Sequence, residues 1–153
     1  MSDSATAVFI EPSAGELWLV LGRLGVALLA GGLIGIERQA HRRAAGLRTH
    51  ILISLAAAAF MLAGGHSGDD LTRVVQGIAV GVGFIGAGSI LKLPESGRIQ
   101  GLTTAGGIWS AAAAGVAAGS GDVILAGVIS VLTVVVTGVL GLLEARWTGG
   151  PSS

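Results

Sequence analysis

Apolar residues in this chain fall into five long runs, separated by short segments that hold most of the charged side chains. The runs cover residues 17–36, 49–65, 73–91, 101–119 and 122–143. A helix needs about 20 mostly apolar residues to cross a bilayer. Backbone groups that face lipid must also pair within their own segment. The pattern therefore predicts an all-α integral membrane protein, a bundle of five transmembrane helices.

The five runs predict one transmembrane domain over residues 17–144. Residues 1–16 form an N-terminal tail and residues 145–153 a C-terminal tail. The first tail contains Asp3, Glu11 and Glu16 but no Lys or Arg, whereas the start of a signal peptide is basic. We therefore expect the first apolar run to remain in the mature protein.

The charges of the linkers predict an orientation, because Arg and Lys favour the cytoplasmic side of a membrane. The first and third linkers are basic, with Arg38, Arg42, Arg43, Arg48, Lys92 and Arg98. The second reads His66-Ser67-Gly68-Asp69-Asp70, and the fourth contributes Asp122. This alternation predicts an N-terminus outside the cell and a C-terminus in the cytoplasm.

Two stretches of the chain are similar to each other, residues 46–59 and 101–114. They match at eight of 14 positions, although a shared run of four alanines contributes half of these matches. One interpretation is a pair of parallel two-helix repeats followed by a fifth helix, as in some transporter folds. The alternative is that membrane helices merely share a composition.

Composition supports a membrane protein and excludes several other classes. Charged residues make up 12% of the chain, whereas an ordinary soluble domain has about 25%. Mean hydropathy is +0.81. The net charge of zero argues against a nucleic-acid partner, and the absence of cysteine excludes disulfides and thiol chemistry. The lipid bilayer is the expected partner.

Small residues recur at every fourth position in two of the predicted helices. The rows are Ala27, Gly31 and Gly35 in the first run, and Ala79, Gly83 and Ala87 with Gly77 and Gly81 in the third. Such rows let helix backbones approach closely in a bilayer. Residues 81–86 also match the dinucleotide fingerprint G-x-G-x-x-G, but this motif has meaning only between a strand and a helix. We interpret the rows as helix packing, and they make a homodimer plausible.

The first group of candidate functional residues lies along the first run and at the predicted cytoplasmic ends of the helices; Arg23 is about one and a half turns inside the outer end of that run. Arg23 and Glu37 are 14 residues apart, which places them near one helix face, an internal stripe through Ala27, Ala30 and Ile34. Glu37 either faces a site or pairs with a nearby Arg such as Arg38. The other candidates follow Gly-Leu pairs: Thr49, Thr103 and Thr104. Their hydroxyls either cap first-turn N–H groups or form an anion or substrate site with Arg48.

The second group lies at the predicted outer end of the third run, where Asp69, Asp70, Arg73 and Gln76 follow His66. Carboxylate and amide oxygens are the ligands that Mg²⁺ prefers, so Asp69 and Asp70 are candidate metal ligands. The alternative is a solvated loop with a helix cap. Gln76 is polar and deeper, so we expect it to find a partner inside the bundle.

No nucleophile and base are spaced for catalysis, so we expect no enzyme and no cofactor, with Mg²⁺ as a candidate ligand.

Several motifs together resemble the N-terminal membrane domain of the MgtC/SapB family. They are Gly31-Gly32-Leu33-Ile34-Gly35-Ile36-Glu37-Arg38, Ala45-Gly46-Leu47-Arg48-Thr49-His50, Arg73 with Gln76, Gly83-Phe84-Ile85-Gly86-Ala87-Gly88 and Gly101-Leu102-Thr103-Thr104-Ala105. The resemblance covers about residues 20–140. It implies a bacterial inner-membrane protein in a family linked to growth under magnesium limitation. Many relatives continue into a soluble cytoplasmic domain, which we expect this chain to lack.

Two functions remain open at this point. The first is a regulatory or interaction protein of the inner membrane that acts in magnesium or envelope homeostasis with other membrane proteins. The second is a small transporter or channel for a divalent cation or another small ion. The resemblance and the few buried ionisable residues favour the first, and the repeat favours the second.

Overall fold

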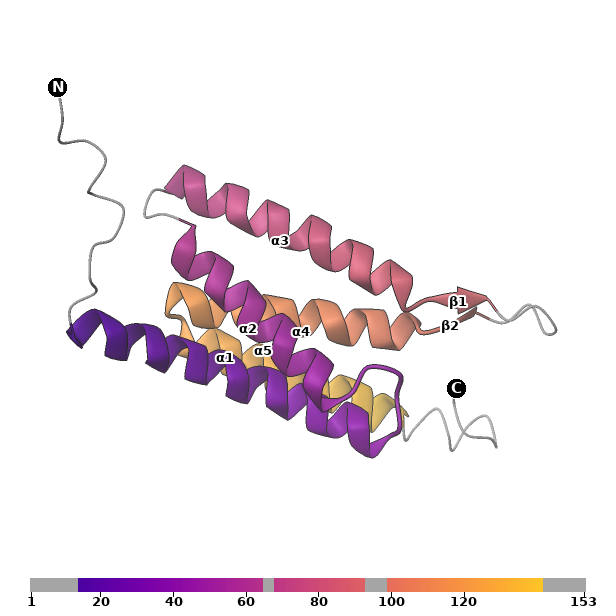
Figure 1. Ribbon diagram of the computed structural model, residues 1–153. Helices are drawn as coiled ribbons and strands as arrows, with labels where there is room; N and C mark the ends of the chain where they lie inside the picture. Colours follow the sequence, from indigo (N-terminus) through magenta and orange to yellow (C-terminus); the bar gives the residue numbers. More distant parts are fainter. Residues whose placement is uncertain (1–13, 65–67, 93–98, 142–153) are drawn as a thin grey trace, which may run out of the picture.

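The computed structural model describes residues 14–64, 68–92 and 99–141, and within them the chain forms a bundle of five helices (Figure 1). The elements are α1 (Ala14–Ala40), α2 (Leu47–Ala63), α3 (Gly68–Gly88), β1 (Leu91–Lys92), β2 (Ile99–Gln100), α4 (Leu102–Ser120) and α5 (Val123–Val135), which continues as the π-helical turn η1 (Val136–Leu140). β1 and β2 pair antiparallel as a short hairpin between α3 and α4.

The predicted all-α bundle is confirmed, and each apolar run corresponds to one helix. α1, α3 and the segment Val123–Leu140 are long and apolar enough to cross a membrane, and α2 is a shorter apolar helix. The number of crossings and the N-out orientation stay predictions. Most of the two predicted tails, together with His66 and Arg98, lies outside the described residues.

α1 extends beyond its apolar run and ends at Ala40 rather than near residue 36. Glu37 and Arg38 therefore lie on the helix and not in a linker. The chain turns only at Arg42, which adopts a left-handed conformation with φ 53°. The β1–β2 hairpin was not predicted, because strands of two residues are too short to show a period-2 pattern.

α4 occupies the centre of the bundle, in contact with α1, α2, α3 and α5 (Figure 1). Most of its residues are buried although it is made largely of alanine and glycine. Small side chains let four neighbours approach one helix. The turn into α5 is tight: Gly121 adopts φ 94°, and the Asp122 side chain accepts from the Leu125 N–H at 2.8 Å.

α2 is held between α1 and α4 by backbone contacts at glycines. A Cβ added to Gly31 would lie 2.6 Å from the His50 carbonyl oxygen, and one added to Gly35 would lie 2.7 Å from the Leu47 Cα. On the other side, Gly115 faces the Ser54 backbone and a Cβ on Gly119 would lie 2.8 Å from the Ala58 oxygen. The row of Ala27, Gly31 and Gly35 therefore packs helices as predicted.

The rows on α3 do not pack in this way. A Cβ added to Gly77 or Gly81 would meet nothing within 4 Å, and one on Gly83 would make only an ordinary contact with Trp109. The prediction that these glycines pack α3 closely against another helix is therefore wrong within one chain. The reason is that α3 lies at the edge of the bundle, with Val82 and Gly86 as its buried residues.

Arg23 caps the end of α4. Its Nη1 donates to the Gly119 carbonyl oxygen at 2.9 Å, and a Cβ on Gly121 would lie 3.0 Å from its Nη2. The last carbonyls of a helix have no partners within the helix, and a cation near them is favourable. The stripe predicted between Arg23 and Glu37 is buried at Ala27, Ala30 and Ile34. Arg23 itself stabilises the fold.

Gly115→Ala should destabilise the protein. The new Cβ would press on the Ser54 backbone, which cannot move without shifting α2, and such overpacking costs roughly 1–3 kcal/mol. Gly127→Ala is the matched control, because a Cβ at Gly127 meets nothing within 4 Å. Thermal unfolding in detergent should show a lower midpoint for Gly115→Ala only. Equal midpoints for the two variants would contradict the close contact.

Arg23→Leu should also lower stability, although it makes α1 more apolar. It removes a charged hydrogen bond to the end of α4, a loss of about 1–3 kcal/mol. A gain in the free energy of unfolding, which hydropathy alone would predict, would refute the capping role. Arg42→Leu, in the exposed α1–α2 loop, is the comparison.

Candidate functional site

Buried polar side chains gather at one end of the bundle. This end holds the last turn of α1, the α1–α2 loop with Arg42 and Arg43, and the first turns of α2 and α4, and we call it the basic end. The opposite end holds Asp69, Asp70 and Asp122 and is the acidic end. The candidate site is the basic-end cluster: Glu37, Arg38, His41, His50, Thr104 and Thr137.

Arg38 is buried at the heart of this cluster, with 1% of its surface exposed. It follows Ala30, Gly31 and Ile34 on the buried face of α1, so its side chain is directed into the bundle. Its Nη2 donates to the Thr104 hydroxyl oxygen at 3.3 Å. Among the described residues, its Nε has no hydrogen-bond partner.

His50 is fully buried in the first turn of α2. Its Nδ1 lies 2.8 Å from the Gly46 carbonyl oxygen. A carbonyl only accepts, so Nδ1 carries a proton. Its Nε2 has no hydrogen-bond partner in the described part of the chain. This nitrogen is directed at Gly107 of α4, where an added Cβ would lie 3.0 Å from it and 3.7 Å from the Arg38 Nε.

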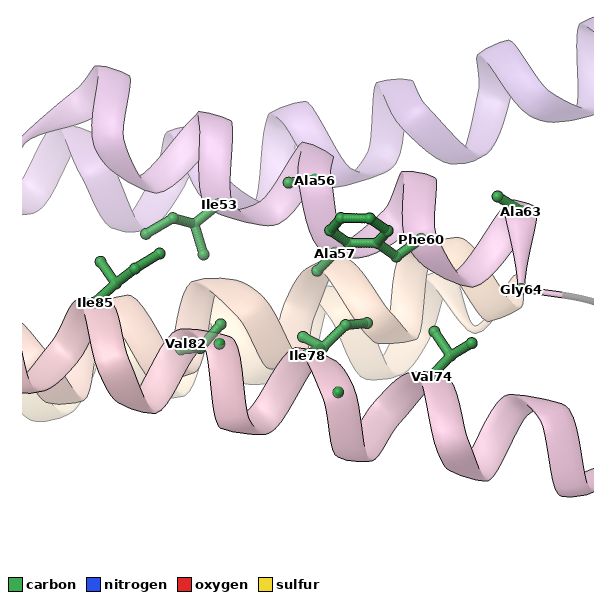
Figure 2. Close-up of a pocket in the computed structure, with 12 residues that line it drawn as sticks. Ile53, Ala56, Ala57, Phe60, Ala63, Gly64, Val74, Ile78, Val82 and Ile85 are labelled. Carbon is green, nitrogen blue, oxygen red and sulfur yellow. The ribbon is translucent and has the colours of Figure 1, made fainter.

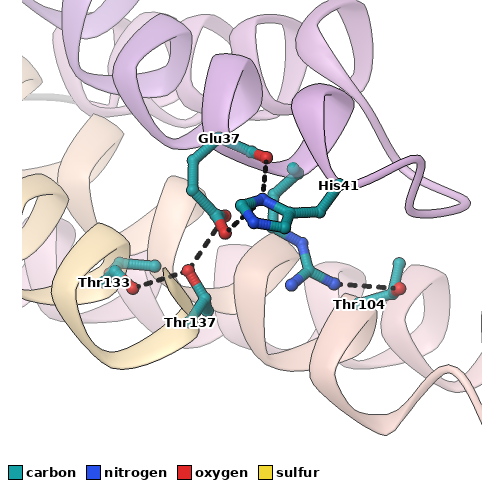
Figure 3. Close-up of polar contacts among 6 residues, drawn as sticks. Glu37, His41, Thr104, Thr133 and Thr137 are labelled. Carbon is teal, nitrogen blue, oxygen red and sulfur yellow. Dashed lines mark hydrogen bonds and ion pairs between the residues drawn. The ribbon is translucent and has the colours of Figure 1, made fainter. Parts of the chain in front are cut away.

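Glu37 reaches toward α5 and its π-helical turn. The Thr137 hydroxyl donates to Glu37 Oε2 at 2.9 Å, and His41 Nδ1 lies 3.1 Å from Oε1 (Figure 3). About 10% of the Glu37 side chain is exposed. Successive residues of one helix face directions about 100° apart, so Glu37 and Arg38 serve different neighbours. π-helical turns occur frequently at functional sites.

The predicted threonine caps are wrong. The N-cap residues of α2 and α4 are Gly46 and Gly101, and neither has a side-chain cap. Thr104 is buried and used by Arg38 instead. Thr49 is half-buried and Thr103 is exposed. The reason is that both helices begin at the leucine of the Gly-Leu pair, which makes the glycine the N-cap and places each threonine inside the first turn.

The other sequence candidates lie apart from the cluster. Arg48 is exposed at the basic end. Asp69, Asp70, Arg73 and Gln76 are all exposed on the first turns of α3, so Gln76 is not turned into the bundle. Over the described ranges, no three His, Asp or Glu side chains are grouped to hold a metal ion. Asp69 and Asp70 as metal ligands stay a prediction, and His66 lies outside those ranges.

Two hollows adjoin the helices. A groove of about 320 Å³ lies between α4 and α5, lined by Thr103, Gly106, Gly107, Ser110, Leu132, Thr133, Val136 and Thr137. It reaches the basic-end cluster at Thr137, and Gly107 in its lining lies beside His50. A larger groove of about 620 Å³ lies between α2 and α3, where Ile53, Phe60, Val74 and Ile85 face one another (Figure 2). Its lining is apolar throughout, so it offers no group that binds an ion.

Sequence reasoning missed His50, His41, Thr137 and Gly107. His50 occupies the fourth position of the Leu-x-x-His turn that opens α2, but no metal-ligand spacing to another His, Asp or Glu marks it in the sequence. Thr137 is 100 residues from Glu37, and no local pattern links the two. Only the spacing of Arg38 from Ile34 and Gly31 could have indicated a buried arginine.

The Glu37–Thr137 bond should be energetically coupled. In a double-mutant cycle of Glu37→Gln and Thr137→Val, we expect a coupling energy of about 1–3 kcal/mol, since the bond involves a carboxylate. Thr133→Val is the matched control, because the Thr133 hydroxyl bonds to the Ile129 oxygen of its own helix. Free energies of unfolding in mixed micelles give both values. A Thr133 coupling as large as that of Thr137 would contradict a direct bond.

Comparison with known proteins places the chain in a family. The sequence pattern of the MgtC family matches residues 24–146. "Putative magnesium transporter YhiD" of Escherichia coli (strain K12) is 42% identical over 134 residues, covering 81% of this chain and 61% of that protein. "Protein MgtC" of Brucella abortus (strain 2308) is 44% identical over 119 residues, covering 76% and 49%.

A third relative is "Protein SrpB" of Synechococcus elongatus, 45% identical over 119 residues and covering 68% of this chain and 65% of its own length. The chain therefore spans about half to two thirds of the length of these relatives. No solved structure matches it. With its apolar helices of membrane-crossing length, this chain is a membrane protein that belongs to the MgtC family.

Proposed function

We propose that this chain acts in magnesium or envelope homeostasis as a regulatory or interaction protein of the bacterial inner membrane. Family membership supports this proposal, as does the printed name of the relative that refers to magnesium. The proposal gives the chain no catalytic step. Its working surface would be the basic end, where the polar side chains are concentrated.

The observation that carries the proposal is the packing of the half of the bundle nearer the acidic end. Ala27, Ala58, Ala118 and Ala126 are completely buried there, and the Gly119 and Ala58 backbones are in contact. A cation that crosses a membrane needs polar groups along its path, because a bare charge in an apolar medium is very costly. A close-packed alanine core suits a rigid scaffold that presents its basic end to a partner.

A transporter or channel is the second candidate, and the α4–α5 groove favours it. The groove is lined by Thr103, Ser110 and Thr137, and the Thr137 hydroxyl also donates to the Glu37 carboxylate. Such oxygens suit a divalent cation. The name of the E. coli relative points the same way.

Self-association is part of the proposal. Gly77 and Gly81 lie in the wall of the α2–α3 groove, and a Cβ added to either would meet nothing within 4 Å. Small residues that are free on a helix face allow another transmembrane helix to approach. We propose a homodimer or other homo-oligomer, with further inner-membrane proteins as partners.

Deletion of the gene should impair growth at micromolar Mg²⁺, and the wild-type chain should restore it. Glu37→Gln should fail to restore growth, because it removes the charge that organises His41 and Thr137. Glu16→Gln, at the other end of the same helix, is the matched control. Immunoblots of membranes must show equal amounts of the proteins. If Glu37→Gln restored growth fully, the proposal that the basic end is the working surface would be contradicted.

Flux measurements in liposomes separate the two candidates. Purified wild-type protein should pass Mg²⁺ no faster than protein-free liposomes, as reported by a Mg²⁺-sensitive dye inside. Flux that exceeds this background and is lost in Glu37→Gln would favour the transporter and contradict the regulatory proposal.

A further inference from the structure

α3 has a face that the described residues leave uncovered. The helix packs against α4 and less extensively against α2 (Figure 1). Its buried residues, Val82 and Gly86, lie on the side toward α4. At about 100° per residue, the side turned away from both neighbours, which we call the outer face, is formed by Asp69, Arg73, Gln76, Val80, Gly83 and Ala87. All of these are exposed except the half-buried Gly83.

The outer face has the spacing of a coiled-coil seam. Its six residues follow one another at intervals of four, three, four, three and four positions. This alternation averages about 3.5 residues, the repeat that keeps one side of a helix against a parallel partner. The last two members, Gly83 and Ala87, are small, which allows two backbones to approach closely. None of the described helices occupies this seam.

Gln76 is the polar residue at the centre of the seam. It lies eight residues after Gly68, the first residue of α3, and thus about 12 Å along the helix at 1.5 Å per residue. This is near the middle of a bilayer core of about 30 Å. The Gln76 side chain is exposed and forms no hydrogen bond within the part of the chain that the structure describes. An amide that faces lipid without a partner is costly, whereas amides that bond across helices hold membrane helices together.

A second copy of the chain supplies the matching group. Two copies inserted in one membrane with the same orientation have parallel α3 helices, and a two-fold axis between them places Gln76 opposite Gln76. A side-chain amide has an acceptor oxygen and donor N–H groups, so each Gln76 amide can donate to the other. A polar residue at one seam position also fixes the register of two helices.

The charged end of the seam is complementary to itself as well. Asp69 and Arg73 form no ion pair with each other or with other described residues. Helix side chains are tilted toward the N-terminus, so Arg73 of one copy extends toward the level of Asp69 in the other. Such pairs at the aqueous rim add little affinity. They favour the same register as Gln76, because complementary charges fix how two surfaces align.

We propose that two copies of this chain associate through the outer faces of α3, with Gln76 paired across the two-fold axis. This interface is the site of the self-association proposed above, on which the inference rests. The competing choice is the groove face of α3, with Gly77 and Gly81. That face is apolar throughout and offers no group that selects a copy of the same chain.

Disulfide cross-linking of the full chain in membranes locates the contact. The chain has no cysteine, so a single introduced cysteine reports only its own position. Val80→Cys and Ala87→Cys on the outer face should form linked dimers on mild oxidation, since the Cβ atoms of a disulfide lie about 3.5–4.5 Å apart. Ile85→Cys is the matched control, because it lies between these positions in depth and faces the groove (Figure 2). It should remain monomeric.

A second measurement tests the amide. Gln76→Leu should weaken dimerisation about tenfold although it makes α3 more apolar, a change of the size expected when hydrogen bonds between membrane helices are lost. Gln76→Asn keeps the amide and should recover most of the affinity. Thr72→Val is the matched control, because the Thr72 hydroxyl is already bonded to the Gly68 oxygen of its own helix. Energy transfer between labelled copies in liposomes of varied protein density gives the dimer fraction.

Three outcomes overturn the inference. One is cross-linking at Ile85 as strong as at Val80, which indicates contact through the groove or random collision. The second is the absence of cross-linking at Val80 or at Ala87. The third is an unchanged dimer fraction in Gln76→Leu. Neither measurement depends on growth at low Mg²⁺, so the failure of this interface and the failure of the proposed function are distinguishable.

Discussion

The contact of three helix backbones determines most of this structure. In a bilayer, burial of apolar side chains gives helices little reason to associate, because lipid is equally apolar. Association then depends on van der Waals packing, which is strongest when backbones touch. Gly31 and Gly35 bring α1 onto α2, and Gly115 and Gly119 bring α4 onto the other side of α2. These contacts fix the positions of the three helices along their axes relative to one another.

The basic-end cluster results from these axial positions of α1, α2 and α4. Since α2 starts at Leu47 beside Gly35, the first turn of α2 lies next to the last turn of α1. The backbone contacts between α2 and α4 place Thr104 and Gly107 of α4 opposite Arg38. Helix starts and a buried arginine are thereby forced together, although their charges repel. Locally unfavourable arrangements of this kind are expected mainly at functional sites.

The sequence predicted well those features that depend on one helix at a time. Apolar length located all five helices, and the fourfold spacing of Ala27, Gly31 and Gly35 identified a real packing face. The sequence did not predict the features that depend on contact between two segments distant in the chain. Arg48 and Arg38 carry the same charge, yet the packing of α1, α2 and α4 buries Arg38 and leaves Arg48 exposed. Thr137 became a partner of Glu37 through the position of α5, which no local spacing encodes.

The position of α3 shows how side chains at matched positions can change a packing pattern. Aligning residues 46–59 with 101–114 matches Ser54 to Trp109 and His50 to Ala105. The glycines of α1 and α3 meet these matched positions: a Cβ on Gly35 would lie 3.3 Å from the His50 Cβ, and one on Gly86 would lie 3.6 Å from the Ala105 Cβ.

The two helix pairs diverge at the next turn. Gly31 meets the small Ser54, whose hydroxyl also donates to the Ala27 oxygen at 2.8 Å, so the backbones of α1 and α2 touch. A Cβ added to Gly83 or Gly86 would instead lie 3.6–3.7 Å from the indole of Trp109. A large ring at this position holds α3 away from α4, since close approach of helices requires small residues on both sides. In the predicted repeat, the closed pair α1–α2 therefore has Gly31 and Ser54 where the pair α3–α4 has Val82 and Trp109.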